Sequence, residues 1–448
     1  MSVKKRKIEL CLALTMISFF ISVSVARAAS YYVDRTNAGA SDGNAGTESR
    51  PWATIQHAAD SVASGDTVYV KTGTYNESIK LKTSGSAGRY ITFRNYPGHK
   101  PIIDGSSTDA QKLIDWKGPA SGGTRKNYII FDGFKVKNAP RWAFWVEGDH
   151  TIIRNCTIHD TGHTGIIVLD SDHTTISSNH IYNTGWNGMS LESCNYSTVE
   201  YNVSHDNLQH FGINIFPKTN WPQTMETGNN IRYNVLYGNM GGIYTRYQKD
   251  NEIIGNLIYK NREYGIFFHA NTAAGGASEY AGRTKVYHNT VADNTKGGIY
   301  NVNATHLSIK GNIFAYHAIQ DFRYELQMNK TEGHAIDYNL YYTIDPAGEF
   351  VYWGGLKYDL AGFRAATAHS NHDQFAEPKF AGRSRDNYRL TAGSPGIDAC
   401  TEPMGVAADL DGNPRPQGAS DQGCYELPKG EVVARQSLDR ELQLVSFQ

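Results

Sequence analysis

The sequence lacks a marked excess of charge of either sign, and it lacks the cysteine spacings of zinc sites. Its 43 basic and 44 acidic residues give a formal net charge of −1 over 448 residues. This balance argues against nucleic acid or an anionic membrane as the main partner, although a locally basic groove for an acidic polymer stays possible. The five cysteines include no Cys-x-x-Cys pair, so we expect no structural zinc site.

Helical periodicity is also missing from the centre of the chain. Between Tyr128 and Tyr342, short apolar strands recur instead, separated by Asn, Gly or Asp. An Asn marks each repeat, and successive Asn residues lie 22 to 33 residues apart. A period in this range with about three short strands per step predicts a parallel β-helix. The marker residues are Asn155, Asn179, Asn202, Asn234, Asn256, Asn289, Asn312 and Asn339.

The repeated Asn suits a corner between two strands, because Asn tolerates the left-handed backbone conformation. Stacked coils would also let its amide bond to the Asn residues above and below. A second polar position follows five residues later in several repeats. Its members are Asp160, Asn207, Asn239, Asn261 and Asn294.

The two ends of the chain read differently from the centre. Residues 1–29 are typical of a signal peptide, with a basic start, an apolar run and a small-residue cleavage site, so we expect a secreted or periplasmic protein with no membrane anchor. Residues 30–78 form an entry module with one helix over Trp52 to Val62. Regular coils are expected over 79–345, terminal coils and a C-terminal cap over 346–427, and a tail over 428–448.

Four cysteines remain after removal of the leader. Cys400 and Cys424 flank a region rich in Gly, Asp and Pro, and an oxidising compartment favours a disulfide between them. Cys156 and Cys194 fall at different phases of their coils and are predicted to be free, buried thiols.

Several motifs carry a family resemblance. The phrases SRPWATIQHAAD and GDTVYVKTGTYNE, the Asn-marked repeat and the segment YRLTAGSPGIDAC make the chain similar to secreted right-handed parallel β-helix proteins of the pectate-lyase type, over roughly Tyr31 to Leu427. The resemblance implies an all-β, single-domain right-handed parallel β-helix with an N-terminal capping helix, and a monomer. It further implies that polysaccharide lies along the sheet formed by the strands that begin with Gly-Ile.

Strand alternation gives the side chains on that sheet. Period 2 buries the residue after the Gly and turns the next one outward. The outward set is Ser190, Glu192, Asn214, Phe216, Tyr244, Arg246, Phe267, His269 and Tyr300, with Lys218 just beyond its strand.

Two long insertions follow Gly-Ile strands, at Thr219 to Gly228 and at Asn271 to Gly282. Solenoids tolerate insertions on one face, often the binding face. These loops are predicted to wall a groove over Tyr244 and Arg246, with Trp221 available to stack on a sugar ring. The predicted substrate-binding residues are Glu192, Asn214, Trp221, Phe267, Tyr300 and His210.

This set suits β-elimination in a uronate polymer. Arg246 would neutralise the carboxylate, Lys218 or His269 would take the C5 proton, and Tyr244 would serve as the acid. A C5-epimerase shares the proton abstraction and is kept as a variant, and a non-catalytic carbohydrate-binding β-helix is kept as a further alternative.

Carboxylates support two other hypotheses. A calcium site could draw on Asp149, Asp170, Asp172 and Glu192, although Asp149 and Asp172 more simply repeat as turn residues. A glycoside hydrolase on the same fold would use Asp170, Glu192 or Asp206.

Overall fold

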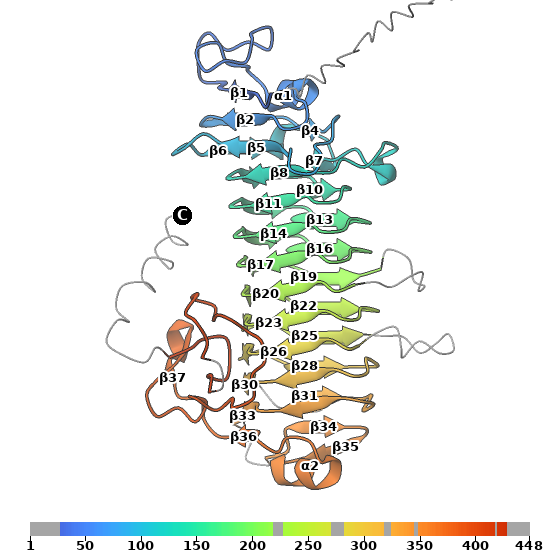
Figure 1. Cartoon of the computed structure of the whole chain (residues 1–448), viewed down its shortest axis with the longest axis vertical. Helices are drawn as coiled ribbons and strands as arrows, with labels where there is room; N and C mark the ends of the chain where they lie inside the picture. Colours follow the sequence, from blue (N-terminus) through green and yellow to red (C-terminus); the bar gives the residue numbers. More distant parts are fainter. Residues whose placement is uncertain are drawn as a thin grey trace, which may run out of the picture.

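The chain folds into a parallel β-helix of three long sheets (Figure 1). The computed structural model describes residues 27–217, 227–269, 282–317, 324–344, 348–416 and 419–427. Each sheet has 12 strands, and each strand pairs with the equivalent strand of the next coil. Almost all of the predicted signal peptide and the whole predicted tail lie outside the described residues.

Sheet 1 opens each coil. Its strands are β1 (Ser30–Val33), β2 (Thr67–Val70), β5 (Ile91–Asn95), β8 (Ile129–Asp132), β11 (Ile152–Arg154), β14 (Thr175–Ser177), β17 (Thr198–Glu200), β20 (Asn230–Arg232), β23 (Glu252–Ile254), β26 (Lys285–Tyr287), β29 (Ser308–Lys310) and β32 (Ala335–Asp337).

Sheet 2 contains the Gly-Ile strands. Its members are β4 (Ile79–Lys80), β7 (Lys112–Asp115), β10 (Trp142–Val146), β13 (Ile166–Leu169), β16 (Met189–Glu192), β19 (Phe211–Phe216), β22 (Gly241–Arg246), β25 (Tyr264–His269), β28 (Gly297–Asn301), β31 (Tyr324–Met328), β34 (Val351–Trp353) and β35 (Leu356–Tyr358). Only the last pair, β34 and β35, is antiparallel among the described strands of this sheet.

Sheet 3 follows sheet 1 along each coil and precedes sheet 2. Its strands are β3 (Gly73–Tyr75), β6 (Pro101–Asp104), β9 (Lys135–Lys137), β12 (Thr157–Thr161), β15 (His180–Thr184), β18 (Val203–His205), β21 (Val235–Tyr237), β24 (Leu257–Tyr259), β27 (Thr290–Ala292), β30 (Ile313–Ala315), β33 (Leu340–Tyr342) and β36 (Gln374–Phe375).

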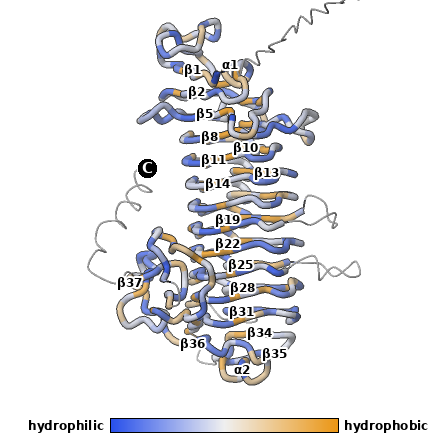
Figure 2. Tube along the Cα trace, in the orientation of Figure 1, coloured by the Kyte–Doolittle hydropathy of each residue, from blue (hydrophilic) through white to orange (hydrophobic). Residues whose placement is uncertain are grey.

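The core consists of columns of equivalent apolar side chains inside the coil. In sheet 1 the middle residue of each short strand points inward and pairs with its equivalent in the next coil. Period-2 alternation produces this pattern, because the flanking residues of each strand face water. Figure 2 shows the result as alternating hydrophobic and hydrophilic residues along the coils. The buried column is Ile153, Ile176, Val199, Ile231, Ile253, Val286, Ile309 and Ile336.

The predicted Asn stack is present as a continuous hydrogen-bonded ladder. Asn234, for example, donates its backbone N–H to Asn256 Oδ1 at 2.9 Å and its Nδ2 to the same oxygen at 3.0 Å. The ladder runs from Asn179 to Asn339 and ends on the carboxylate of Asp373. A second ladder runs from Asn207 through Asn294, at the second polar position of the repeat. These buried amides satisfy the backbone groups of the corners.

The left-handed corner residue, however, is the one before the ladder Asn. Ser178 and Tyr201 have positive φ, whereas Asn179 and Asn202 do not. The Asn amide therefore works as a hydrogen-bonding group rather than as a conformational device. Asn155 and Asp160 do have positive φ, so both lie one residue before the ladder positions that the sequence analysis gave them.

Helices lie at both ends of the solenoid (Figure 1). At the N-terminal end, α1 (Ile55–Ser61) is shorter than predicted, because Thr54 is its N-cap and its side chain accepts the N–H of His57 at 3.1 Å. At the C-terminal end, α2 (Leu360–Thr367) follows β35. Short 3-10 turns are η1 (Gly105–Ser107), η2 (Pro119–Ser121) and η4 (Arg383–Arg385).

The C-terminal segment packs along the flank of the solenoid rather than over its end. After β36 the chain turns back beside sheet 3 and forms the hairpin of β37 (Phe380–Gly382) and β38 (Asn387–Leu390) (Figure 1). Gly423 donates its N–H to Gly311 O at 2.8 Å, and Cys424 donates its N–H to Thr290 Oγ1 at 3.0 Å. The cap expected from sequence is therefore a lateral clasp.

The predicted disulfide is absent, because Cys400 and Cys424 are both free and buried. Cys400 pairs through its backbone with Ser420, whereas Cys424 packs in an apolar cluster with Tyr233 and Leu257. Their backbone partners thus hold the two thiols at different places in the clasp. Cys156 and Cys194 are free and buried, as predicted.

Candidate functional site

The outer face of sheet 2 carries two neighbouring rows of side chains in register. In the first row, Asn214 pairs with Tyr244, and Tyr244 pairs with Phe267. In the second row, Arg246 pairs with His269. Strands β22 and β25 therefore bring a phenol, a guanidinium and an imidazole into one block of adjacent positions. Tyr300 continues the first row on β28.

Tyr244 and His269 are joined by a hydrogen bond between coils. Tyr244 Oη lies 3.0 Å from His269 Nδ1. The phenol ring packs against Phe211, with ring centroids 5.0 Å apart, and edge-on to Phe267 at 5.2 Å. These aromatic contacts fix the orientation of the phenol while both polar groups stay half-buried.

The electrostatics of this block keep the imidazole neutral and the phenol protonated. Burial, with a smaller contribution from the Arg246 charge, lowers the pKa of His269. Burial raises the pKa of Tyr244, and Arg246 opposes that shift only in part. At neutral pH, therefore, His269 keeps a free lone pair and Tyr244 keeps its hydroxyl proton.

Arg246 supplies the positive charge beside this pair. Its guanidinium carbon lies 5.1 Å from the centroid of the Tyr247 ring, and its Nε is buried without a hydrogen-bond partner in the described part of the chain. A buried guanidinium N–H with no acceptor has the potential to bind an incoming anion.

Two residues predicted to face outward are almost fully buried. Ser190 and Asn214 lie in the outward row, but they are only 1% and 3% exposed. Their short side chains lie between larger neighbours of other coils, such as Ile167 and Tyr244. Ser190 Oγ and Asn214 Oδ1 have no hydrogen-bond partner within the described ranges.

His210 lies at the edge of this face. Its Nδ1 is 2.9 Å from Asn187 Oδ1, and its ring stacks on Trp186 at 4.8 Å. Burial lowers its pKa to about 4. His210 lies 6.2 Å from the Tyr244 ring, measured between centroids, so it borders the block without joining the Tyr244–His269 hydrogen bond.

The strand alternation alone did not identify the aromatic residues that precede the glycines. Phe211 and Tyr264 precede the Gly of their strands and pack against the block, Phe211 on Tyr244 and Tyr264 on Tyr300, with the Tyr264 and Tyr300 ring centroids 4.8 Å apart. An aromatic residue directly before Gly-Ile was the available signal, in the phrases FGIN and YGIF.

Lys218 and Trp221 lie outside the described residues, as do most of the two insertions predicted to wall a groove. Glu192 and Phe216 are half-exposed and pair in the second row of sheet 2.

The calcium candidates Asp149 and Asp172 act as turn residues. Asp149 Oδ1 accepts the N–H of Asp172 at 2.9 Å, and Asp172 Oδ1 accepts the N–H of Asn195 at 3.0 Å. These bonds repeat from coil to coil, and in each of them a carboxylate oxygen accepts a backbone N–H group. Asp170 donates its N–H to Glu192 O at 2.8 Å, which places the other two candidates on adjacent coils. None of the four belongs to a group of three close ligands within the described ranges.

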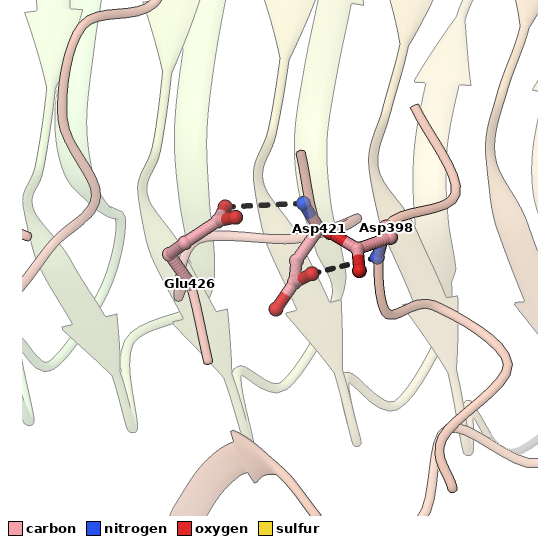
Figure 3. Close-up of side chains that lie close together, drawn as sticks. All are labelled: Asp398, Asp421 and Glu426. Carbon is pink, nitrogen blue, oxygen red and sulfur yellow. Dashed lines mark hydrogen bonds between the residues drawn. The ribbon is translucent and has the colours of Figure 1, made fainter. Parts of the chain in front are cut away.

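One acidic cluster of the described residues does have close carboxylates, in the clasp (Figure 3). Glu426 Oε2 accepts from Arg415 at 2.7 Å and from the N–H of Asp421 at 3.0 Å. Asp421 in turn accepts the N–H groups of Asp398 and Leu427. Arg415 and backbone donors therefore engage Glu426 Oε2 and the Asp421 carboxylate.

Asp206, a carboxylate proposed for hydrolysis, belongs to a different sheet. Its Oδ2 lies 2.7 Å from His205 Nδ1 at the end of β18 in sheet 3. It is therefore engaged away from the Tyr244–His269 pair on sheet 2.

Comparison with known proteins agrees with this architecture. The model of the Pel9A-like right-handed β-helix region matches residues 31–332. The chain belongs to this family. Its three-sheet solenoid is thus a right-handed parallel β-helix, as the sequence predicted.

Two solved structures resemble this chain in fold at low sequence identity. The crystal structure of pectate lyase Pel9A superposes with a TM-score of 0.59 at 17% identity, over 89% of this chain and 96% of that one. The complex of XylC with xylose superposes with a TM-score of 0.57 at 13% identity, over 89% and 98%. At these identities the similarity establishes the fold alone.

Two curated proteins match a short stretch. Uncharacterized protein YwoF of Bacillus subtilis is 45% identical over 67 residues, 15% of this chain and 14% of that protein. Pectate lyase PEL9 of Emericella nidulans is 40% identical over 67 residues, 14% of this chain and 16% of that protein. The chain thus matches only about one sixth of the length of these relatives.

In the described ranges, no helix has the length and hydropathy required to cross a membrane.

Proposed function

We propose that the protein is a secreted polysaccharide lyase that cleaves a uronate-containing polymer by β-elimination at the outer face of sheet 2. The observation that carries the proposal is the 3.0 Å contact between Tyr244 Oη and His269 Nδ1, directly beside Arg246. Two relatives with pectate lyase in their names, Pel9A and PEL9, support the choice of substrate class.

Each group has a distinct task. Arg246 binds the uronate carboxylate and thereby makes the C5 proton more acidic, because it stabilises the enolate-like charge that develops there. Neutral His269 removes this proton through Nε2. The C4–O4 bond breaks, its electron pair leaves with O4, and a C4–C5 double bond forms.

Tyr244 completes the step as the acid. Its hydroxyl proton passes to the departing O4, and His269 Nδ1–H then returns a proton to the phenolate across their hydrogen bond. The aromatic contacts of Phe211 and Phe267 hold the phenol in place for this transfer. Arg246 provides the neutralising charge, so no step requires a metal ion.

A substrate panel tests the proposal. The mature protein is incubated with pectate, alginate, chondroitin and neutral glycans, and the ultraviolet absorbance of the unsaturated product is recorded together with new reducing ends. Both signals should rise on at least one uronate polymer, and His269→Gln and Tyr244→Phe should remove both.

Other outcomes would contradict it. New reducing ends without the absorbance would indicate a hydrolase, and retention on the glycan without products would indicate binding alone. Full activity in both His269→Gln and Tyr244→Phe would exclude the assigned centre.

A further inference from the structure

A second polar cluster lies on the outer face of sheet 3, away from the proposed catalytic centre. His180 opens β15, and His205 ends β18 in the next coil. Tyr182 pairs with His205, and His180 pairs with Val203 two residues earlier, so both histidines project from the same face.

The two imidazoles face each other through their ε nitrogens. His180 Nε2 lies 2.8 Å from His205 Nε2. On the opposite side of its ring, His205 Nδ1 lies 2.7 Å from Asp206 Oδ2. The carboxylate keeps the proton on Nδ1 and leaves Nε2 with its lone pair. Histidines that bind metals are commonly oriented by a carboxylate in this way.

The neighbouring coil repeats the arrangement. His159 Nδ1 lies 2.7 Å from Asp160 Oδ2, while His159 Nε2 is buried and has no hydrogen-bond partner among the described residues. The His159 side chain is buried beneath the Tyr182 ring, with the whole residue only 7% exposed. Tyr182 stacks between His159 and His205, which holds these rings in a fixed array.

We propose that His180 and His205 are the protein ligands of a divalent transition-metal site. Imidazole nitrogens favour zinc, copper and nickel over calcium or magnesium. Tetrahedral zinc with Zn–N bonds of about 2.05 Å requires the two nitrogens to be roughly 3.3 Å apart. A small rotation of either side chain supplies the remaining separation, and water completes the coordination.

Proton balance favours metal binding at neutral pH. When neutral His180 carries its proton on Nδ1, its Nε2 no longer donates to His205 and has a lone pair for the metal. Metal binding then requires no proton to leave the two imidazoles. A bound metal would join β15 to β18 across two coils, and this role does not depend on the proposed lyase activity.

Calorimetric titration of the untagged, EDTA-dialysed protein with zinc chloride tests the site. We expect about one zinc ion per chain, and we expect zinc to raise the unfolding temperature. His180→Gln and His205→Gln should abolish this binding. Asp206→Asn, which keeps both ligands and removes the orienting charge, should weaken it about tenfold or more.

His150→Asn is the matched control, because His150 stacks on His173 at a different corner of the coil. It should bind zinc as the wild type does. If either ligand variant fails to fold, the copper-loaded wild type should show nitrogen couplings in its electron paramagnetic resonance spectrum, and Asp206→Asn should alter them. Failure of the wild type to bind zinc, or unchanged affinity in Asp206→Asn and in whichever ligand variants fold, would overturn the proposal.

Discussion

Tyr244 and His269 come from adjacent coils, and their hydrogen bond depends on strand register. A one-residue slip of β25 against β22 would turn His269 into the core and separate the pair. The geometry of the centre is therefore fixed by the same pairing of strands between coils that builds the solenoid. Individual side chains then decide the chemistry.

Arg246 is the first residue to test. Arg246→Ala should lower kcat/KM by about a thousandfold, because it removes the charge that stabilises the developing enolate. Arg246→Lys keeps the charge but loses the bidentate geometry, so it should retain more activity than the alanine variant. Steady-state kinetics on the active polymer measure both. Arg232→Ala, on the outer face of sheet 1 and paired with Glu200, is the control and should be unaffected. A fully active Arg246→Ala enzyme would contradict the role.

The pH dependence should follow His269. Its pKa is lowered by burial and by Arg246, so the neutral, active form persists below the usual histidine range, about 6.5. The plot of kcat/KM against pH should thus stay flat from neutrality down past this value and fall only at lower pH. Loss of activity on the acid side already above pH ~7 would be inconsistent with His269 as the base.

Part of this centre could be predicted from the sequence. The outward positions of Arg246, Phe267 and His269 follow from period 2 after each Gly-Ile. The burial of Ser190 could not be predicted, because it depends on the size of neighbours in other coils. The Tyr244–His269 bond likewise depends on side-chain rotamers, which a strand pattern does not specify.

At the scale of the elements, the glycines of sheet 2 allow the coil to close. A Cβ on Gly242 would lie 2.3 Å from Ile258 Cγ2 of β24 and 2.5 Å from Gly265 O. Equivalent glycines recur at this position in neighbouring coils, including Gly188 and Gly212. The glycine thus allows close contact between sheets 2 and 3 rather than an unusual backbone conformation.

Gly242→Ala should therefore destabilise the protein by about 2 kcal/mol or more, through overpacking against sheet 3. Chemical denaturation followed by circular dichroism measures the change. Gly43→Ala is the control, because its nearest neighbour would be Ser41 Oγ at 3.6 Å, an ordinary contact. Equal stability of the two variants would argue against the tight packing of this column.

The Asn ladder should be equally sensitive. Asn256 donates to Ile231 O and Asn289 Oδ1, each at 2.9 Å, and accepts from Asn234. Asn256→Ala leaves several buried backbone groups unsatisfied, so we expect a loss of about 3 kcal/mol in unfolding free energy.

Thermal and denaturant unfolding provide the measurement for this ladder variant. The exposed Asn76 offers a control, since Asn76→Ala should change stability by less than about 0.5 kcal/mol. A loss at position 256 no larger than this would show that the ladder contributes little.

The sequence predicted the ladder but misplaced its first members. Cys156 and Thr161 occupy the positions assigned to Asn155 and Asp160, because the corner residue before each ladder position can also be Asn or Asp. Only the register between coils resolves this ambiguity. The same limit explains the incorrect disulfide between Cys400 and Cys424, whose positions are set by contacts with distant coils.

At the scale of the molecule, the lateral clasp packs on the outer side of sheet 3 in the C-terminal coils only (Figure 1). Asp293 accepts from the Arg383 guanidinium at 2.9 Å through Nε and from Tyr388 Oη at 2.9 Å. Lys310 and Glu402 form a further ion pair at 2.7 Å. Contacts spanning about ninety residues in sequence hold the clasp in place, which is why the repeat pattern alone did not predict its position.

Asp293→Ala should loosen the clasp without dissolving the solenoid. Removal of the acceptor leaves the Tyr388 hydroxyl and part of the Arg383 fork unpaired, and should cost about 2 kcal/mol. Hydrogen exchange in residues 380–390 should rise while the exchange of the core strands stays slow. Asp386→Ala, which removes a more exposed partner of Lys260, is the control and should have a smaller effect. Unchanged exchange in Asp293→Ala would show that other contacts hold the clasp.

The stacked amides have one further consequence, for how such a chain grows. Each ladder Asn directs its backbone N–H to the amide oxygen of the following coil, and the series stops at Asp373, whose Oδ1 accepts the backbone N–H and the Nδ2 of Asn339. An additional complete turn copied into the middle would find a matching neighbour on each side, whereas a turn appended past the aspartate would find no amide to continue the series. Lengthening by internal duplication is thus compatible with this architecture, and the terminal carboxylate marks where extension ends.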